Sequence, residues 1–136
     1  MILGVDFGDS RTGYATSDSL GFAAHTLETF NEKNMNKVAQ YTAKLAKDLG
    51  AEKIVLGFPK NMNGTVGDRG KKTKKFAAIL RELTGLEVIL WDERLTTVSA
   101  HNLMNETNVR GKKRKEAVDK IAAAYILQAY LDSNKI

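Results

Sequence analysis

The sequence opens with the run Ile2-Leu-Gly-Val-Asp6-Phe7, the turn Gly8-Asp-Ser-Arg11, and a second run, Thr12-Gly-Tyr-Ala-Thr-Ser17. The first run is apolar except for the carboxylate near its end, which is typical of a short buried strand, Ile2–Phe7. The second run predicts another strand, Thr12–Ser17, and the short link favours antiparallel pairing of the two. Weaker alternation predicts a third strand over Ala24–Phe30. The chain therefore begins with an antiparallel meander.

Beyond residue 31 the apolar residues change from alternation to the spacing of amphipathic helices. Gly50 supplies a helix stop, and Pro59, the only proline, closes the strand that follows. The elements predicted here are a helix over 34–49, strand Lys53–Phe58, a polar loop over 61–70, a helix to about Leu83, strand Glu87–Trp91, and two helices, about Thr97–Asn105 and Arg114–Leu131, separated by a basic loop. This order predicts one α/β domain over residues 1–136, with a mixed sheet and right-handed parallel crossovers.

Composition limits the class of protein. Hydrophobic residues make up 43% of the chain and charged residues 27%, close to the average for soluble globular proteins. No apolar run approaches the roughly 18–20 residues that a membrane-spanning helix needs, and the N-terminal run lacks the basic segment of a secretory signal. The chain contains no cysteine, which excludes disulfides, thiolate metal sites and cysteine nucleophiles. We expect a cytoplasmic protein with no membrane partner.

The net charge of +5 arises in the second half of the chain. Residues 1–60 carry seven Lys/Arg and seven Asp/Glu, whereas residues 61–136 carry fourteen Lys/Arg and nine Asp/Glu. Clustered cations attract nucleic acids because binding releases condensed counterions, although such clusters also serve as solvated faces that keep a protein soluble. Two clusters on one small domain favour a nucleic-acid partner. They are Arg69, Lys71, Lys72, Lys74 and Lys75, and Arg110, Lys112, Lys113, Arg114 and Lys115.

Three acidic positions stand in apolar surroundings. Asp6 closes the first strand, and the pair Asp92-Glu93 directly follows the apolar run Val88–Trp91. Asp119 shares its predicted helix face with small residues, Ala122 and Ala123, which would let the helix approach the sheet and bring Asp119 toward Asp6. A buried carboxylate without a partner is costly, so such groups form ion pairs or bind metal.

Pairing with Arg11, Arg94 or Lys120 would satisfy any one of these carboxylates. Three together indicate instead a divalent cation held by oxygen ligands, and Mg²⁺ or Mn²⁺ suits carboxylates better than Zn²⁺ where cysteine and a histidine pair are lacking. Metal ions lower the pKa of an attacking water and stabilise a leaving oxygen, while basic flanks hold backbone phosphates. This combination points to hydrolysis of phosphodiester bonds.

Four segments carry a resemblance to a known family: Gly4-Val-Asp6-Phe-Gly8-Asp-Ser-Arg11-Thr-Gly13, Ile54-Val-Leu-Gly-Phe-Pro59 with Asn61-Met-Asn-Gly64, Asp92-Glu-Arg-Leu-Thr-Thr97, and Val118-Asp119-Lys-Ile-Ala-Ala123 with Ile126-Leu127. In this order, over essentially the whole chain, they resemble the YqgF/RuvX family of Holliday-junction-resolvase-like proteins. The resemblance implies an RNase H-like fold, with a mixed five-stranded sheet of order 3-2-1-4-5, strands 4 and 5 parallel to strand 1, and flanking helices. It also implies a metal-dependent nuclease, associated with maturation of the 5′ end of pre-16S ribosomal RNA and also described as a Holliday junction resolvase.

By position, the resemblance implies that Asp6 is the central metal-binding carboxylate and that Asp119 is the ligand from the helix. The pair Asp92-Glu93 would supply the third ligand. In the implied strand order, strand five lies two strand spacings, roughly 9–10 Å, from strand one, so the longer side chain of Glu93 is favoured and Asp92 is the alternative. The catalytic set is therefore Asp6, Glu93, Asp119 and Asp92, of which the first three would bind Mg²⁺ or Mn²⁺.

Substrate contacts are expected from arginines near these carboxylates, from the loop after Pro59 and from the basic clusters. Arg11 would contact a phosphate or pair with Asp9 or Asp18. The substrate would be structured RNA such as pre-rRNA, or branched DNA, and a non-catalytic nucleic-acid-binding module is a third reading. A resolvase requires a symmetric dimer, so a monomer and a homodimer both stay open. The candidate substrate-binding residues are Arg11, Arg94, Asn61, Asn63, Lys71, Lys72, Arg110, Lys112, Lys113 and Arg114.

Overall fold

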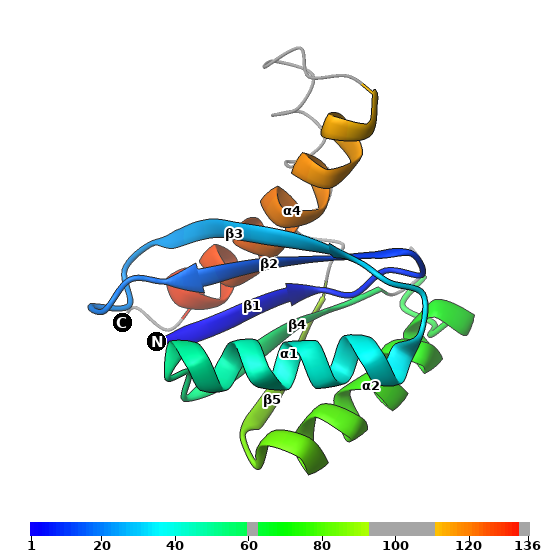
Figure 1. Ribbon diagram of the computed structural model, residues 1–136, viewed down its shortest axis with the longest axis horizontal. Helices are drawn as coiled ribbons and strands as arrows, with labels where there is room; N and C mark the ends of the chain where they lie inside the picture. The colour runs from blue at the N-terminus through cyan, green and yellow to red at the C-terminus, as the bar shows by residue number, and fades with distance from the viewer. Residues whose placement is uncertain (60–62, 93–110, 134–136) are drawn as a thin grey trace.

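The computed structural model describes residues 1–59, 63–92 and 111–133, with side chains from residue 117 onward in the last range. Its elements are β1 (Ile2–Asp6), β2 (Arg11–Ser17), β3 (Ala24–Asn31), α1 (Met35–Leu49), β4 (Lys53–Phe58), α2 (Asp68–Thr84), β5 (Glu87–Asp92) and α4 (Gly111–Ser133). The sheet has the order β3-β2-β1-β4-β5 (Figure 1). β1 pairs antiparallel with β2 and parallel with β4, and β5 is parallel to β4. The predicted RNase H-like sheet is confirmed.

Alternation along the strands divides the core between the two faces of the sheet. Leu3 and Val5 are buried on the face covered by α1 and α2. Ala15 and Val55 are buried on the other face, against Leu127 and its neighbours in α4. Figure 1 shows α1 and α2 on one side of the sheet and α4 on the other. Because α4 runs over β1, β2 and β3, it determines what lies beside the end of β1.

The carboxyl ends of the three parallel strands lie along one edge of the sheet. These ends are Asp6 in β1, Phe58 in β4 and Asp92 in β5, and the antiparallel β2 begins at the same edge with Arg11. We call this the carboxyl edge. Ligands of open α/β sheets bind outside the carboxyl ends of their strands, so this edge is where a site is expected.

The predicted and observed elements differ mainly where helices begin. α2 begins at Asp68, so the end of the predicted loop over 61–70 is helical. Gly70 suggested a loop, but it is buried in α2, where a Cβ would lie 2.6 Å from a side-chain atom of Val66. α4 begins at Gly111, three residues before the predicted start at Arg114, so Lys112 and Lys113 belong to its first turn and not to a loop. Lysine and arginine are good helix formers, and their charge density alone suggested a loop.

Other boundaries agree within a residue or two. α1 begins at Met35, where the Asn34 side chain accepts a hydrogen bond of 3.1 Å from the Lys37 amide, and Gly50 ends it with a φ of 67°. The helix predicted over Thr97–Asn105 lies outside the described residues. None of the described helices is long and apolar enough to cross a membrane.

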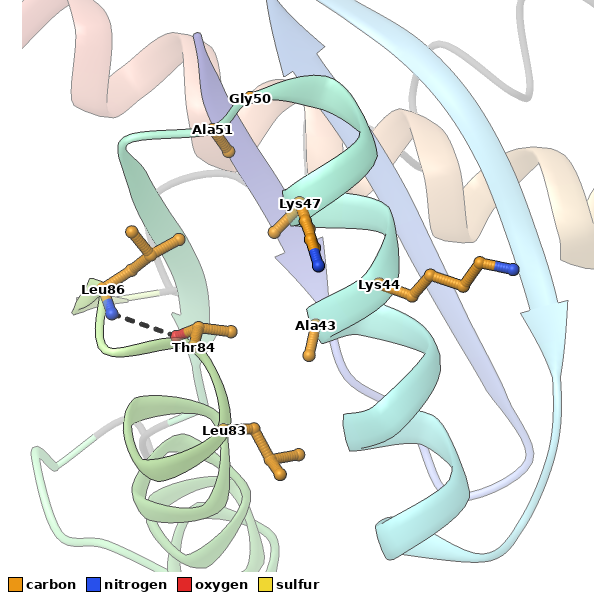
Figure 2. A pocket seen from close by; sticks show the side chains of 9 residues that line it. Ala43, Lys44, Lys47, Gly50, Ala51, Leu83, Thr84 and Leu86 are labelled. Atoms are coloured by element: carbon orange, nitrogen blue, oxygen red, sulfur yellow. Dashed lines mark hydrogen bonds between the residues drawn. The ribbon is translucent and has the colours of Figure 1, made fainter.

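The opposite edge of the sheet carries a groove of a different character. It has a volume of about 510 Å³ and lies between the C-terminal ends of α1 and α2 (Figure 2). Leu83 and Leu86 contribute aliphatic surface, and Lys44 and Lys47 contribute charge. No carboxylate is among its described lining residues, so the groove offers none of the predicted metal ligands.

Candidate active site

Asp6 ends β1 at the carboxyl edge, on the face of the sheet that α4 covers. Leu3 and Val5 are buried against α1 and α2, whereas Gly4 lies against α4. A Cβ on Gly4 would come within 3.0 Å of the backbone carbonyl oxygen of Ala123. Asp6 lies two residues further along the strand, so it belongs to the same face, where it is half-buried.

Asp119 lies level with Asp6, because α4 contacts β2 at Gly13. Gly13 pairs with Asp6 across β1 and β2, so these two residues share a face. A Cβ on Gly13 would lie 2.1 Å from the carbonyl oxygen of Asp119, so the helix backbone rests directly on β2 there. One turn further along α4, Ala123 contacts Gly4. The step from Gly4 to Asp6 along β1 and the step from Ala123 to Asp119 along α4 each cover roughly 6–7 Å. Asp119 therefore lies level with Asp6.

Small residues on both elements permit this approach. Ala122 and Ala123 are buried in α4, as the sequence indicated. Gly4 and Gly13 complete the contact from the sheet, because each would carry a Cβ too close to the helix backbone. A glycine inside a strand is the sequence signal for such close backbone approach.

Arg11, the first residue of β2, forms an ion pair with Asp119. Its Nε donates a hydrogen bond of 2.8 Å to Oδ2 of Asp119, and the two side chains are 34% and 19% exposed. Arg11 therefore contacts one of the acidic positions that the sequence offered as its partner, whereas the two carboxylates nearer to it in the sequence are engaged elsewhere. Asp9 lies 3.6 Å from Nζ of Lys72, and Asp18 accepts a hydrogen bond of 2.9 Å from the backbone amide of residue 22. A cation is therefore fixed against the helical carboxylate.

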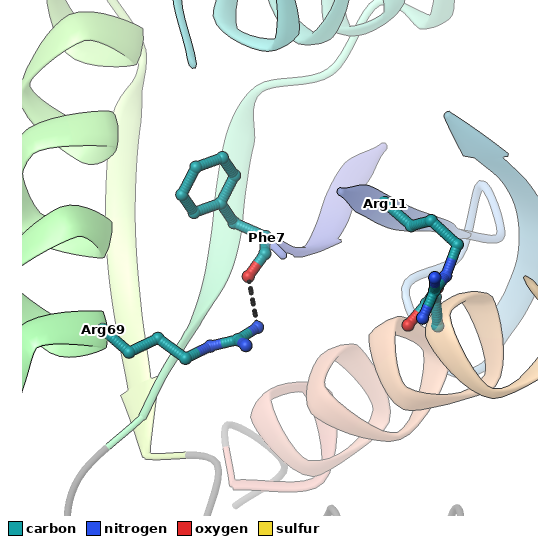
Figure 3. Close-up of polar contacts among 4 residues, drawn as sticks. Phe7, Arg11 and Arg69 are labelled. Carbon is teal, nitrogen blue, oxygen red and sulfur yellow. Dashed lines mark hydrogen bonds and ion pairs between the residues drawn. The ribbon is translucent and has the colours of Figure 1, made fainter. Parts of the chain in front are cut away.

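A second arginine reaches the end of β1 from the opposite side. Arg69, in the first turn of α2, donates from Nη2 to the backbone carbonyl oxygen of Phe7 at 2.9 Å. Figure 3 shows Arg69 and Arg11 on either side of the end of β1. The sequence placed Arg69 only in a basic cluster. Arg69 belongs to the first turn of the helix that follows the parallel strand β4, and such a position is the signal for a residue at the carboxyl edge.

Asp92 ends β5 but belongs to the other face of the sheet. Trp91 packs against the core beneath α4, whereas Leu90 packs on the side of α1 and α2. Because side chains alternate between the two faces along β5, Asp92 belongs to the same face as Leu90, the side of α1 and α2. Its partner across the neighbouring strand β4 is Phe58. Asp6 and Asp92 are therefore on opposite faces.

Several predicted site residues lie outside the described part of the chain. These are Glu93, Arg94, Asn61 and Arg110, together with the side chains of Lys112, Lys113 and Arg114. Within the described ranges no three Asp, Glu or His side chains form a cluster that could hold a metal ion. Of the predicted ligands, these ranges include Asp6 and Asp119.

The remaining predicted contacts are on the surface. Asn63 accepts hydrogen bonds from the amide and the hydroxyl of Thr65, at 3.1 and 2.7 Å, so its side chain shapes its own loop. Lys71 and Lys72 are exposed on α2. These lysines are accessible to a polyanion at the carboxyl edge.

A polar hollow of about 450 Å³ opens beside Arg11. The other residues that line it are Ser10, Asn31, Glu32 and Lys33. The backbone amides of Asn34 and Lys33 donate to the Glu32 carboxylate, which lowers its pKa and holds the carboxylate in place. The hollow therefore combines cations with a fixed acceptor next to the Arg11–Asp119 pair.

The strand order, the carboxylate that ends β1 and the helical carboxylate beside it define an RNase H-like domain. Solved structures share this fold. Thermus thermophilus RuvC in complex with a Holliday junction substrate matches with a TM-score of 0.61 at 10% identity, over 97% of this chain and 96% of that one. A Fowlpox virus resolvase in complex with Holliday junction DNA matches with a TM-score of 0.60 at 14% identity, over 99% of both chains.

Relatives at higher identity identify the family. A family model described as "RuvX: Holliday junction resolvase" matches residues 1–133. A "Putative pre-16S rRNA nuclease" of Clostridium novyi (strain NT) is 47% identical over 132 residues, which cover 97% of this chain and 98% of the relative. A relative of the same name from Agathobacter rectalis is 50% identical over 134 residues, 96% of this chain and 94% of the relative. The chain belongs to the RuvX family.

Proposed function

We propose that the protein is a cytoplasmic, metal-dependent endonuclease that hydrolyses phosphodiester bonds in the 5′-end processing of pre-16S ribosomal RNA. The convergence of Asp6 and Asp119 at the carboxyl edge carries the proposal, because two carboxylates beside fixed cations are suited to binding a metal and a phosphate. RNA is chosen as substrate because relatives at 47% and 50% identity carry the name of a pre-16S rRNA nuclease.

Asp6, Asp119 and Glu93 would hold Mg²⁺ or Mn²⁺. The two proposed ligands within the described ranges are carboxylates, which fit a hard divalent cation. Glu93 is preferred to Asp92 because Asp92 belongs to the face of the sheet opposite Asp6. When bound, such ions lower the pKa of an attacking water and stabilise the leaving oxygen of the phosphodiester.

Arg11 would position Asp119. Its Nε holds Oδ2 at 2.8 Å, which fixes the orientation of the carboxylate. The guanidinium also offsets the repulsion between two carboxylates that lie level with each other. Arg11 is one-third exposed, so its other N–H groups can reach a substrate phosphate.

The cations of α2 and α4 would hold the rest of the substrate backbone. α4 runs antiparallel to β1, because Ala123 lies at Gly4 and Asp119 lies at the level of Asp6. The first turns of α4 therefore extend beyond the carboxyl edge, as Figure 1 shows. Lys112, Lys113 and Arg114 belong to these turns, and Lys71 and Lys72 are exposed on α2.

A second candidate function is the resolution of Holliday junctions. The description of the family model and the fold shared with two resolvases favour it. Resolution requires two active sites related by a two-fold axis, because two strands of the junction are cut symmetrically. A homodimer would therefore accompany this function, whereas processing of a single RNA strand is open to a monomer.

Cleavage of two substrates by the purified protein tests both functions. The substrates are a pre-16S rRNA fragment spanning the mature 5′ end and a four-way DNA junction, each with Mg²⁺, Mn²⁺ or EDTA. Asp6→Asn and Asp119→Asn remove a proposed ligand, and Asp48→Asn, at an exposed position of α1, is the matched control. We expect the wild type and the Asp48→Asn control to cleave the RNA in the presence of metal. The Asp6→Asn and Asp119→Asn variants should not cleave it. Paired symmetric nicks in the junction, with intact RNA, would favour the resolvase, and binding without cleavage would favour a non-catalytic module.

A further inference from the structure

We propose that Arg69 binds a backbone phosphate of the substrate on the α2 side of Asp6, while Arg11 lies on the α4 side. The inference rests on the proposed function, in that it concerns the same site and a phosphodiester substrate. It adds a residue whose role is contact with the phosphate backbone. The substrate would then cross the end of β1 between the two arginines (Figure 3).

A rigid anchor holds Arg69 at this place. Its Nη2 donates to the carbonyl oxygen of Phe7, the residue after Asp6, at 2.9 Å. The Phe7 ring is stacked on Phe76 of α2, with ring centroids 4.1 Å apart and an interplanar angle of 9°, and Phe7 is 8% exposed. The guanidinium is therefore tied to a well-packed part of the backbone directly beside the proposed metal ligand.

The guanidinium of Arg69 also has capacity for a further partner. The Phe7 carbonyl takes one of its several N–H donors. No carboxylate in the described ranges forms an ion pair with Arg69, whereas Arg11 is paired with Asp119 and Lys72 with Asp9. Arg69 is exposed, and its planar group suits bidentate binding of phosphate oxygens.

Gly8 lies close to the backbone of Arg11 and to the side chain of Arg69. A Cβ at Gly8 would lie 2.3 Å from the carbonyl oxygen of Arg11 and 3.6 Å from Nη2 of Arg69. The turn therefore packs closely against the Arg11 backbone and lies beside the Arg69 guanidinium, and glycine allows another backbone to approach it. Glycine at this position leaves the adjacent side of the Arg69 guanidinium uncovered by any side chain of residue 8.

The chain offers a matched control for Arg69 on the same helix. Arg81, near the other end of α2, donates from Nη2 to the carbonyl oxygen of Val88 at 2.8 Å. Both arginines are exposed and both donate to a backbone carbonyl oxygen, but Val88 is near the start of β5, away from the carboxyl edge. Arg69→Gln and Arg81→Gln thus remove the same charge and the same kind of hydrogen bond.

Binding in EDTA separates this proposal from the nuclease proposal, because it requires neither metal nor cleavage. The probes are the labelled pre-16S rRNA fragment and the four-way junction, each titrated over a range of salt concentrations. For the probe that the wild type binds more tightly, we expect Arg69→Gln to raise Kd about tenfold at low salt. We also expect the slope of log K against log salt to fall by about one unit. Arg81→Gln should leave both values unchanged, and both variants should show a similar small fall in Tm.

Arg69→Lys distinguishes phosphate binding from a purely structural role. Lysine keeps the charge but not the planar group, so we expect it to retain the wild-type salt slope with a smaller rise in Kd. An unchanged slope in Arg69→Gln, or an equal loss of affinity in Arg81→Gln, would overturn the proposal. A wild type without salt-dependent binding of either probe would overturn it too. The expected rise in Kd and fall in salt slope for Arg69→Gln, together with no cleavage by the wild type, would support the role of Arg69 and contradict the nuclease.

Discussion

Arg11 and Asp119, which are 108 residues apart in the chain, are joined at the carboxyl edge by a hydrogen bond of 2.8 Å from Nε to Oδ2. This bond links β2 to α4 beside Gly13, where the helix backbone rests on the strand opposite Asp6. The N-terminal meander and the C-terminal helix thus supply one carboxylate each to the same place. The candidate site forms only when both ends of the chain are folded together.

Arg11→Gln should separate activity from stability. Without the guanidinium, Asp119 loses its fixed orientation, and we expect cleavage to fall about 10- to 100-fold, the range typical of residues that orient a metal ligand. The free energy of unfolding should fall by less than about 1 kcal/mol, because the ion pair is partly exposed. Initial cleavage rates and urea unfolding measure the two effects. Lys33→Gln, in the same hollow, is the control, and full activity of Arg11→Gln would contradict the positioning role.

Gly13→Ala tests the contact between α4 and β2. The new methyl group would lie 2.1 Å from the carbonyl oxygen of Asp119, so the helix backbone must move. We expect the free energy of unfolding to fall by about 2–3 kcal/mol, as for other overpacked cores, with loss of metal-dependent cleavage. Gly85→Ala is the control, because its φ is +68° and a Cβ there meets nothing within 4 Å. That variant should lose about 1 kcal/mol and keep its cleavage activity, and equal losses in both variants would contradict the close packing.

Two tyrosines make the stability sensitive to alkaline pH. Burial raises the pKa of Tyr14, whose hydroxyl lies 2.6 Å from Oγ1 of Thr42. Burial and the hydrogen bond to Glu28 raise the pKa of Tyr41 from 10.0 to about 12. The folded protein therefore keeps protons that the unfolded chain releases above about pH 10, so the free energy of unfolding falls as the pH rises from there toward 12.

Urea unfolding at a series of alkaline pH values checks this dependence. Tyr14→Phe and Tyr41→Phe each remove one of the raised pKa values, so each should make the decline in the free energy of unfolding less steep. A decline of equal steepness in the wild type and both variants would show that other groups control the alkaline limb.

Neutralising the start of α4 should weaken nucleic-acid binding. One variant removes four cations from the turns of α4 that extend beyond the carboxyl edge. It combines Lys112→Gln, Lys113→Gln, Arg114→Gln and Lys115→Gln. We expect the salt slope of binding to fall by about one unit for each backbone phosphate that the variant no longer neutralises. Lys44→Gln with Lys47→Gln, at the groove on the opposite edge, is the control and should leave the slope unchanged. An unchanged salt slope of binding in the α4 variant would show that these residues do not contact the substrate and only keep the protein soluble.

The strands could be predicted well because their signals are local. The apolar run that ends at Asp6 and the run before Pro59 each give a strand within a residue of the observed bounds. Helix starts were less certain because they depend on packing. Gly70 suggested a loop, but a glycine is needed there because α2 packs against Val66 and the carbonyl of Pro59.

The candidate site was predictable in its carboxylates and less so in its cations. Asp6 and Asp119 stood out because a charge in an apolar run needs a partner. The sequence offered Arg11 as a partner for Asp119 but could not select it over Asp9 or Asp18, because the pairing depends on where α4 crosses β2. The sequence placed Arg69 in a basic cluster that follows a parallel strand, which indicates the carboxyl edge but does not identify the Phe7 carbonyl as its partner.

Binding of Mn²⁺ to the purified protein, measured by isothermal titration calorimetry, tests most directly whether Asp6 and Asp119 form a metal site. The set comprises the wild type, Asp6→Asn, Asp119→Asn and the control Asp48→Asn, each with its fold checked by circular dichroism. We predict that the wild type and Asp48→Asn bind Mn²⁺ alike and that each of the other two variants binds at least about tenfold more weakly. Equal Mn²⁺ affinity in all four folded proteins would contradict the site.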